Sequence, residues 1–170
     1  PGAYLAFSPE YYFSFFAVNN YKDVKIYIAQ AKRDGKSRYN YKTELFEGGV
    51  LQIGIANEGE ECFDLPESSP DFGENIAAYY YWIFPGLMLN FYPWGLSVNI
   101  VNPISVNKTQ IIYHGFVRNK SLLGKGAGGD LDKVELEDQD IVEATQRGVS
   151  SRAYDRGRYS PTKEKGVHHF

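Results

Sequence analysis

The sequence predicts an α+β domain in which a mostly antiparallel sheet precedes one long C-terminal helix that lies across it. Two observations carry this prediction. Between residues 77 and 117, four short strand-like runs follow one another with turn signals between them, and such short spacing favours an antiparallel meander. From Leu131 to about Tyr154, apolar residues then recur at helical spacing.

The densest apolar run is AAYYYWIFPGLMLNFYPWG, residues 77–95, which contains no charged side chain. Pro85, Gly86, Asn90 and Pro93 interrupt it, so it lacks the ~18 uninterrupted apolar residues of a membrane helix. It instead predicts two strands, 77–84 and 87–92, joined by a turn at Pro85-Gly86. Further strands are predicted over 96–101 and 109–117.

The segments before this run are less regular. Residues 43–56 have strand character around a Gly48-Gly49 break, and 57–75 form an acidic, proline-containing loop. Within 1–31 we expect further strands, followed by a charged loop over 32–40. We therefore divide the chain into an unassigned N-terminal segment, 1–42, and a domain over 43–170, which together form one compact domain.

Composition limits the classes of function. The 170 residues carry a net charge of −3, which offers no large positive field for DNA or RNA. Cys62 is the only cysteine, so the chain can form neither an internal disulfide nor a cysteine-rich metal site. A lone cysteine fits a reducing compartment, and the opening PGAY shows no signal-type apolar run. These features predict a cytoplasmic protein.

The glycine-rich stretch GKGAGG, residues 124–129, satisfies the dinucleotide-binding pattern and precedes a helix. No second parallel strand follows that helix, and Val149 and Ser150 stand where an acidic residue would bind a ribose. A flexible connection, with Asp130 or Asp132 capping the helix, explains the stretch better than nucleotide binding.

The helix carries an acidic residue on its apolar side. Its inward stripe is predicted to consist of Val134, Ile141, Val142, Thr145, Val149 and Ala153. Asp138 falls on that stripe, whereas Gln139 and Glu143 fall on the outer side and Glu135 lies near the margin. A carboxylate facing a core is costly unless it is hydrogen-bonded, paired or bound to metal. The alternative is a partly exposed aspartate that favours the helix dipole.

Three histidines are the other potential metal ligands. His114 lies in a predicted strand, where a hydrogen-bonded structural histidine is the usual role. His168 and His169 are adjacent, and neighbouring side chains do not face each other in a helix or strand. A site made from the three requires the fold to bring them together.

Several stretches together resemble the catalytic C-terminal domain of the Rieske-type ring-hydroxylating oxygenase alpha subunit. They are TELFEGGVLQIG, YYYWIFPGLMLNFYPWGLSVNIVNPIS and LEDQDIVEATQRGVSSRAYDRGRYSPTKEKGVHHF, which occur in the family's order and span residues 43–170. The resemblance implies a helix-grip, START-like fold, in which the antiparallel sheet wraps around the long helix. It also implies a mononuclear Fe(II) held by two histidines and one carboxylate. Carried over, that carboxylate is Asp138; Glu137 is a neighbour with a weaker claim.

The resemblance further implies an oxygenase that hydroxylates an apolar or aromatic small molecule with O₂. Its electrons would come from NAD(P)H through a ferredoxin or reductase and a two-iron two-sulfur Rieske cluster, and the family assembles as trimers. In the family the sheet that includes residues 77–95 shapes an apolar substrate cavity.

The chain also departs from the family pattern. The family's histidine pair precedes the TELF strand, yet residues 1–42 contain no histidine, and the cysteine and histidine ligands of a Rieske cluster are absent from the sequence. Gly86 stands where asparagine is usual. We expect a longer parent chain to supply the missing ligands. The alternatives are an iron-free small-molecule binding domain on the same fold and, less well supported, nucleotide binding at 124–129.

Overall fold

The computed structural model describes residues 40–156 and 164–170. The strands and loop expected before residue 40 lie outside these residues. Two compact units are distinguished within the described part. One comprises residues 40–100 and 112–130, and the other comprises 101–111, 131–156 and 164–170.

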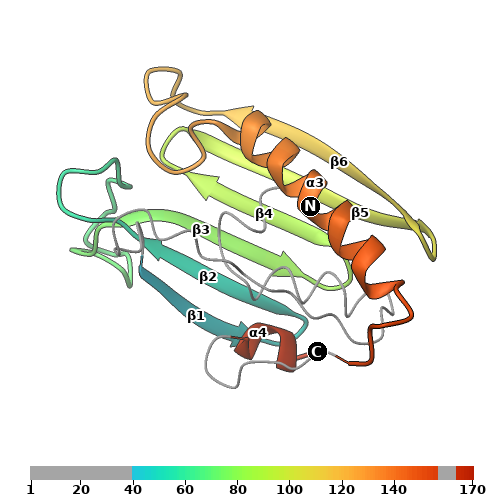
Figure 1. Cartoon of the computed structure of the whole chain (residues 1–170). Coiled ribbons are helices and arrows are strands. Elements are labelled where there is room, and N and C mark those ends of the chain that lie inside the picture. The colour runs from blue at the N-terminus through green and yellow to red at the C-terminus, as the bar shows by residue number, and fades with distance from the viewer. Residues whose placement is uncertain (1–39, 157–163) are drawn as a thin grey trace. The chain divides into compact units, whose positions relative to one another are not determined.

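Six antiparallel strands form one sheet in which each strand lies beside the next along the chain (Figure 1). The strands are β1 (Asn40–Phe46), β2 (Gly49–Ile55), β3 (Ile76–Ile83), β4 (Leu87–Tyr92), β5 (Gly95–Ser105) and β6 (Lys108–Val117). This meander confirms the predicted antiparallel sheet. The break at Gly48-Gly49 is the turn between β1 and β2, where Gly48 has a φ of 75° that glycine adopts without steric cost.

The uncharged run beginning at Ala77 forms strands, as predicted. β3 and β4 are joined by a turn at residues 84–86, and Tyr92 pairs with Gly95 across the next, two-residue turn. Among the described residues, no helix has the length and apolar character needed to cross a membrane.

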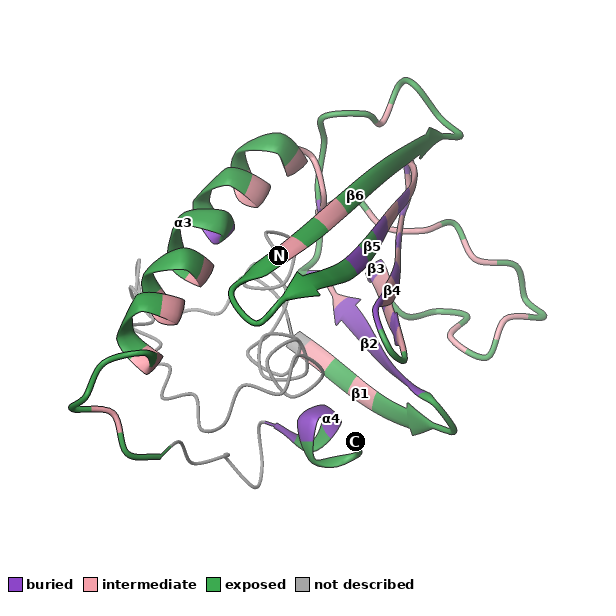
Figure 2. Cartoon of the chain, turned by 90° about the vertical axis from the view of Figure 1, so that its right-hand side faces the viewer, coloured by how far each residue is buried: buried purple, intermediate pink, exposed green. Residues whose placement is uncertain are grey.

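The two faces of β2–β5 have different chemistry. One face carries the apolar cluster Leu51, Ile53 and Ile76, against which Phe63 and Leu65 of the 57–75 loop pack. The loop is held there by a hydrogen bond from the Tyr79 hydroxyl to Asp71 Oδ2, at 2.9 Å. The alternate residues of β2–β5 form the opposite face, and these are buried except at the two ends of β5. Buried residues of both faces are purple in Figure 2.

Towards the C-terminus, α3 (Leu131–Val149) and α4 (Lys165–His168) are the described helices. α3 begins at the predicted residue but ends five residues before Tyr154, because the chain turns at residues 150–153. Ala153 therefore does not belong to the helical stripe and is exposed. Asp130 directly precedes α3, and Asp132 lies in its first turn, where a negative charge favours the helix dipole.

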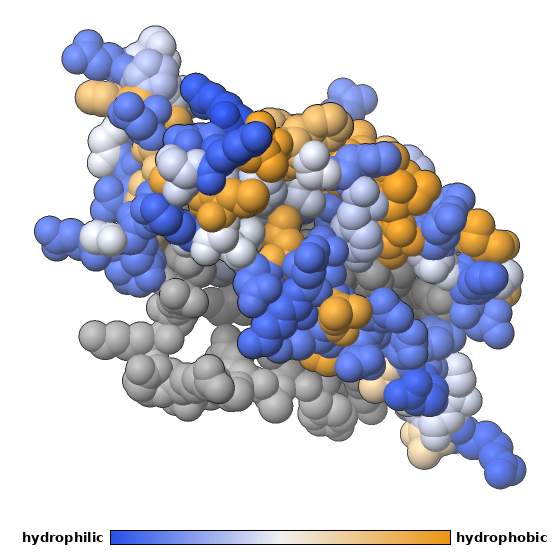
Figure 3. Space-filling model, turned by 90° about the horizontal axis from the view of Figure 1, so that it is seen from above, coloured by the Kyte–Doolittle hydropathy of each residue, from blue (hydrophilic) through white to orange (hydrophobic). Residues whose placement is uncertain are grey.

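Apolar side chains also lie on the surface, where they interrupt hydrophilic ones in the space-filling view (Figure 3). Several come from the last two strands and the turn between them: Ile104, Val106, Ile112, Tyr113, Phe116 and Val117.

Candidate functional site

A row of polar and aromatic residues crosses the mostly buried face of β2–β5, opposite the one that carries Leu51 and Ile53. Gln52 on β2 lies opposite Tyr80 on β3, Tyr80 lies opposite Asn90 on β4, and Asn90 lies opposite Ser97 on β5. All four side chains are buried. Gln52 Nε2 also donates a hydrogen bond to Thr43 Oγ1 on β1, at 3.4 Å. The centre of this face is therefore polar, unlike the apolar cavity wall expected from the sequence.

Three nitrogen donors on or beside this face have no hydrogen-bond partner in the part of the chain that the structure describes. They are Asn90 Nδ2, Asn99 Nδ2 and Trp94 Nε1. Asn90 is 3% exposed and Asn99 is fully buried. Because buried polar groups are nearly always hydrogen-bonded, a set of unsatisfied donors on one face marks a place where a ligand or water would bind.

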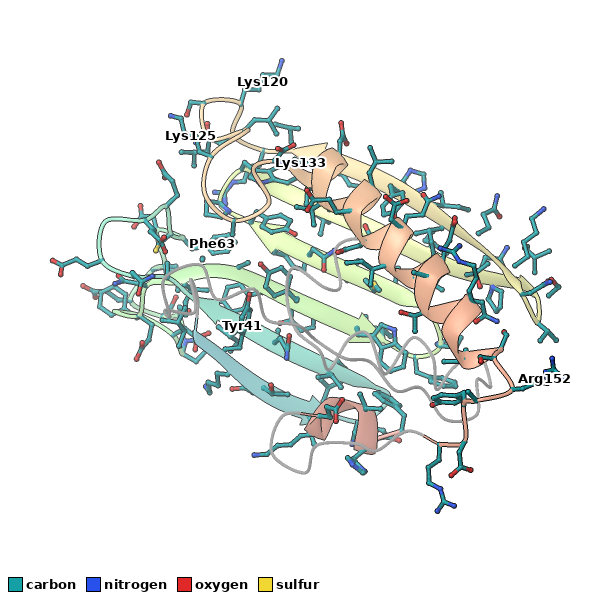
Figure 4. The ribbon with its side chains drawn as sticks, in the orientation of Figure 1. Tyr41, Phe63, Lys120, Lys125, Lys133 and Arg152 are labelled. Atoms are coloured by element: carbon teal, nitrogen blue, oxygen red, sulfur yellow. The ribbon has the colours of Figure 1, made fainter. Side chains whose placement is uncertain are left out.

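Aromatic rings surround these donors. The ring of Tyr92 stacks on Trp94 with centroids 5.2 Å apart, and it meets Tyr80 edge-on at 5.9 Å. Tyr41 on β1, labelled in Figure 4, adds a fourth ring, with its centroid 6.5 Å from that of Tyr80. We call Tyr41, Tyr80, Tyr92 and Trp94 the aromatic cluster. Tyr80, Tyr92 and Trp94 are buried, and Tyr41 is half-buried. An aromatic ring face that is not covered by another ring attracts a cation that has been removed from water.

The glycine-rich loop packs against this cluster. A Cβ atom added at Gly128 would lie 2.7 Å from the Tyr92 ring, and one added at Gly126 would lie 2.8 Å from Glu61 Cβ. Ala127 between them is buried, whereas Lys125 in the loop and Lys120 just before it point outward (Figure 4). The glycines therefore allow a close approach to protein atoms. The loop is a packed segment and not the flexible connection expected, and this packing leaves nucleotide binding without support.

α3 presents Asp138 as its one buried residue. The side chain is 4% exposed, whereas Gln139 and Glu143 lie in solvent and hydrogen-bond to each other at 3.2 Å. Glu137 is also exposed and faces Lys133, with Nζ and Oε1 3.9 Å apart. Asp138 is therefore buried, as its place on the predicted stripe requires; its role as a metal ligand stays a prediction. Because Glu137 is exposed, it does not share the buried position of Asp138, and its claim to be a metal ligand is the weaker one.

The buried stripe of α3 differs from the predicted one at Ile141, which is 46% exposed. Each residue advances ~100° around a helix, so Ile141 lies about 60° from Asp138 on one side. Leu131, Val142 and Val149, which are half-buried, lie on the other side. Glu135 is on that second side and is half-buried too, and burial, with a contribution from Asp132, raises the pKa of Glu135 to about 7.

The remaining candidate ligands are dispersed. His114 on β6 is exposed, as are His168 and His169 at the end of the chain. Cys62 is half-buried and donates a hydrogen bond to the Glu60 carbonyl oxygen at 3.3 Å, and burial raises the pKa of its thiol. Residues 40–156 and 164–170 contain no group of three or more His, Cys, Asp or Glu side chains placed to hold a metal ion.

Comparison with known proteins decides the family. Residues 57–170 match the family described as ring hydroxylating alpha subunit, catalytic domain. The chain belongs to this family. The match covers the strands β3–β6, the glycine-rich loop and α3 with Asp138, so the polar face and the buried carboxylate both lie largely within the catalytic domain.

Relatives of this catalytic domain include two plant enzymes. The choline monooxygenase of Arabidopsis thaliana is 31% identical over 162 residues, and that of Spinacia oleracea is 28% identical over 161. In each case the match covers 89% of this chain but only 36% and 35% of the relative, respectively. The chain thus spans little more than a third of the length of the relatives it matches.

Solved structures show the same fold. A quaternary ammonium Rieske monooxygenase described in relation to carnitine oxidation aligns with a TM-score of 0.59 at 22% identity, covering 92% of this chain and 45% of that one. The quaternary ammonium Rieske monooxygenase CntA in an inhibitor complex aligns with a TM-score of 0.58 at 19% identity, covering 93% and 44%.

Sequence reasoning missed the buried amides. The signal was present in LMLNFY, where Asn90 has the same parity as Met88 and Tyr92 and must share their face. In β5, Ser97 and Asn99 alternate with apolar residues in the same way.

Proposed function

We propose that this chain is part of the catalytic domain of a Rieske non-heme iron monooxygenase that oxidises a quaternary ammonium compound. The observation that carries the proposal is the aromatic cluster beside the buried Asn90 on one face of the sheet. The choline monooxygenases among the relatives and the quaternary ammonium monooxygenases among the solved structures support the same class of substrate.

The chemistry of this face suits a cation better than a hydrocarbon. A quaternary ammonium group has no N–H bond, so it is held by ring faces and not by hydrogen bonds, and the attraction is stronger where water is excluded. The apolar or aromatic substrate expected from the sequence would leave the amides of Asn90 and Asn99 unsatisfied, at a cost in binding free energy.

Asp138 is the residue of this chain that we propose as an iron ligand. A buried carboxylate is a hard oxygen donor, and a site of two histidines and one carboxylate leaves positions open for oxygen. The two histidines would come from outside the described residues, as would the Rieske cluster. The chemistry that the iron supplies when bound is the activation of dioxygen. In the helix-grip arrangement that we propose, the sheet wraps around α3.

The whole protein would need further components. We propose that electrons reach it from NAD(P)H through a ferredoxin or reductase, and that it works as a homo-oligomer. One of the related quaternary ammonium monooxygenases is described in terms of inter-subunit electron transfer, which is consistent with an oligomer here. A cytoplasmic location stays a prediction.

The test is turnover by the full-length protein that contains this chain. With iron, a reductase and NADH, we expect choline or carnitine to stimulate NADH oxidation and to yield a product containing one oxygen atom from ¹⁸O₂. Naphthalene serves as the aromatic comparator. Turnover of naphthalene alone would contradict the quaternary ammonium assignment and support an aromatic substrate. Tight binding of choline without iron uptake or turnover would support the iron-free binding domain.

A further inference from the structure

Two amide side chains on the buried face both offer an unused N–H group. Asn90 Nδ2 and Asn99 Nδ2 lack hydrogen-bond partners within the described residues, and neither side chain is more than 3% exposed. An unsatisfied buried donor lowers stability unless a partner is bound. Two such donors close together are more readily explained by a bound group than by two independent defects in packing.

Register places the two amides at diagonal positions on neighbouring strands. Asn90 on β4 is opposite Ser97 on β5, and Asn99 is two residues further along β5 on the same face. The backbone positions of such diagonal neighbours on adjacent strands lie about 7–8 Å apart, so one small ligand group can reach both side chains. The Ser97 hydroxyl donates to Asn99 Oδ1 at 2.9 Å, which satisfies the oxygen of that amide and leaves its nitrogen to donate elsewhere.

The cation-binding rings lie next to this pair. Tyr80 is directly opposite Asn90, and its ring contacts Tyr92, two residues beyond Asn90 on the same strand. A ligand whose cationic nitrogen lies on these rings can therefore reach the amides with an oxygen that is only a few bonds from that nitrogen. Both amides donate, so the matching group is an acceptor oxygen.

We propose that Asn90 and Asn99 together bind the acceptor oxygen of the substrate, a carboxylate or a hydroxyl, while the aromatic cluster binds its quaternary ammonium group. This assignment rests on the proposed function and makes the two asparagines specificity-determining residues. It explains why a face lined with Met88, Trp82 and Tyr92 also carries two buried amides with unused N–H groups.

The test measures binding to the full-length protein by isothermal titration calorimetry. The probes are tetramethylammonium, which has no oxygen, choline, which has a hydroxyl, and carnitine, which has a hydroxyl and a carboxylate. The variants are Asn90→Leu and Asn99→Leu. Asn102→Leu is the control because Asn102 is exposed and lies on β5, the strand of Asn99. For the wild type we expect choline or carnitine to bind about tenfold or more tightly than tetramethylammonium.

Each leucine variant should remove that advantage and leave tetramethylammonium affinity within about twofold of the wild type, and Asn102→Leu should change neither. Asn99→Asp separates the two oxygen sources: it should abolish tight binding of a carboxylate by charge repulsion, whereas a hydroxyl can donate to the new carboxylate. The proposal is overturned if both leucine variants bind all three probes like the wild type, since the amides would then hold only water.

The failure of the proposed function gives a different result. If none of the three probes binds to the wild type, the quaternary ammonium assignment falls and the role of the asparagines falls with it. If tetramethylammonium binds as tightly as choline and carnitine, only the asparagine assignment falls. Should a leucine variant not fold, a crystal structure of the wild-type choline complex decides: the inference requires the choline oxygen within hydrogen-bonding distance of both Nδ2 atoms.

Discussion

Tyr80 on β3 lies directly opposite Asn90 on β4, so a ring able to hold a cation and an amide able to donate a hydrogen bond share one buried face. Neighbours in this register have Cβ atoms about 4.5–5.5 Å apart. This pair is the centre of the candidate substrate-binding face. Trp82 and Tyr92 lie on the same face and are buried too, whereas Tyr79, Tyr81 and Phe91 lie on the opposite face.

The ring of Tyr80 can be tested separately from its hydroxyl. Replacing Tyr80 by Leu should weaken the binding of tetramethylammonium to the full-length protein by roughly 5- to 30-fold, because a desolvated cation–π contact is lost. Tyr80→Phe should bind within about threefold of the wild type. Tyr81→Leu is the control because Tyr81 lies on the opposite face of β3. Equal binding by Tyr80→Leu and the wild type would remove Tyr80 from the site.

Much of the fold follows from local sequence signals. Strands end where the sequence contains turn residues, at Pro85-Gly86 and at Gly48-Gly49. Proline restricts the backbone and glycine adopts conformations that other residues avoid, so both residue types mark turns. The inward position of Asp138 follows from its helical spacing to Val134 and Val142.

Other features depend on contacts between distant residues. Gly128 lies beside Tyr92, 36 positions earlier in the chain, and no local pattern in GKGAGG predicts that contact. For the same reason, the sequence does not distinguish the packed loop from a flexible one. The helical pattern misplaces Ile141 because this residue lies about 60° around the helix from Asp138. At that angle an apolar residue can lie inside or outside the buried stripe, and the sequence does not show where the centre of the stripe is.

Gly128 should tolerate substitution poorly. Its φ of 70° is strained for any other residue, and a methyl group there would overlap the Tyr92 ring. Gly128→Ala should therefore lower the free energy of unfolding by about 2–4 kcal/mol. Gly124→Ala is the matched control, because Gly124 has a similar φ of 83° but no atom closer than 4.0 Å to the added carbon. Denaturant unfolding that gave equal losses for both would exclude the overlap with Tyr92.

The exposed position of Ile141 changes the expected cost of truncating it. Ile141→Ala should cost less than about 1 kcal/mol, because little packing is lost and alanine favours the helix. Val142→Ala, which truncates a half-buried neighbour, should cost more, about 1–2 kcal/mol. The reverse order in thermal or denaturant unfolding would place Ile141 in the core after all.

Glu135 should make stability depend on pH. Its folded pKa of about 7 is higher than the ~4.3 of an unfolded glutamate, so the folded state binds the proton more tightly. The stability that this proton supplies is fully present below about pH 4.3 and is lost as the pH rises through 7. The unfolding temperature of the wild type, measured relative to Glu135→Gln, should therefore fall between pH 5 and pH 8. A constant difference over this range would show that Glu135 has an ordinary pKa.

Asp138 should be required for iron but not for folding. Asp138→Asn should lower the iron content of the anaerobically loaded full-length protein to the amount that the proposed Rieske cluster alone would contain. Asp140→Asn, the same change at an exposed position of α3, should keep the full iron content. Circular dichroism of both variants should match the wild type, which separates loss of the ligand from loss of the helix.

The most direct test of this assignment is a crystal structure of the iron-loaded full-length protein, with anomalous diffraction data collected at the iron absorption edge. We expect an anomalous peak bonded to a carboxylate oxygen of Asp138, with two histidines as the other protein ligands. A fully occupied mononuclear iron whose ligands exclude Asp138 would contradict the assignment.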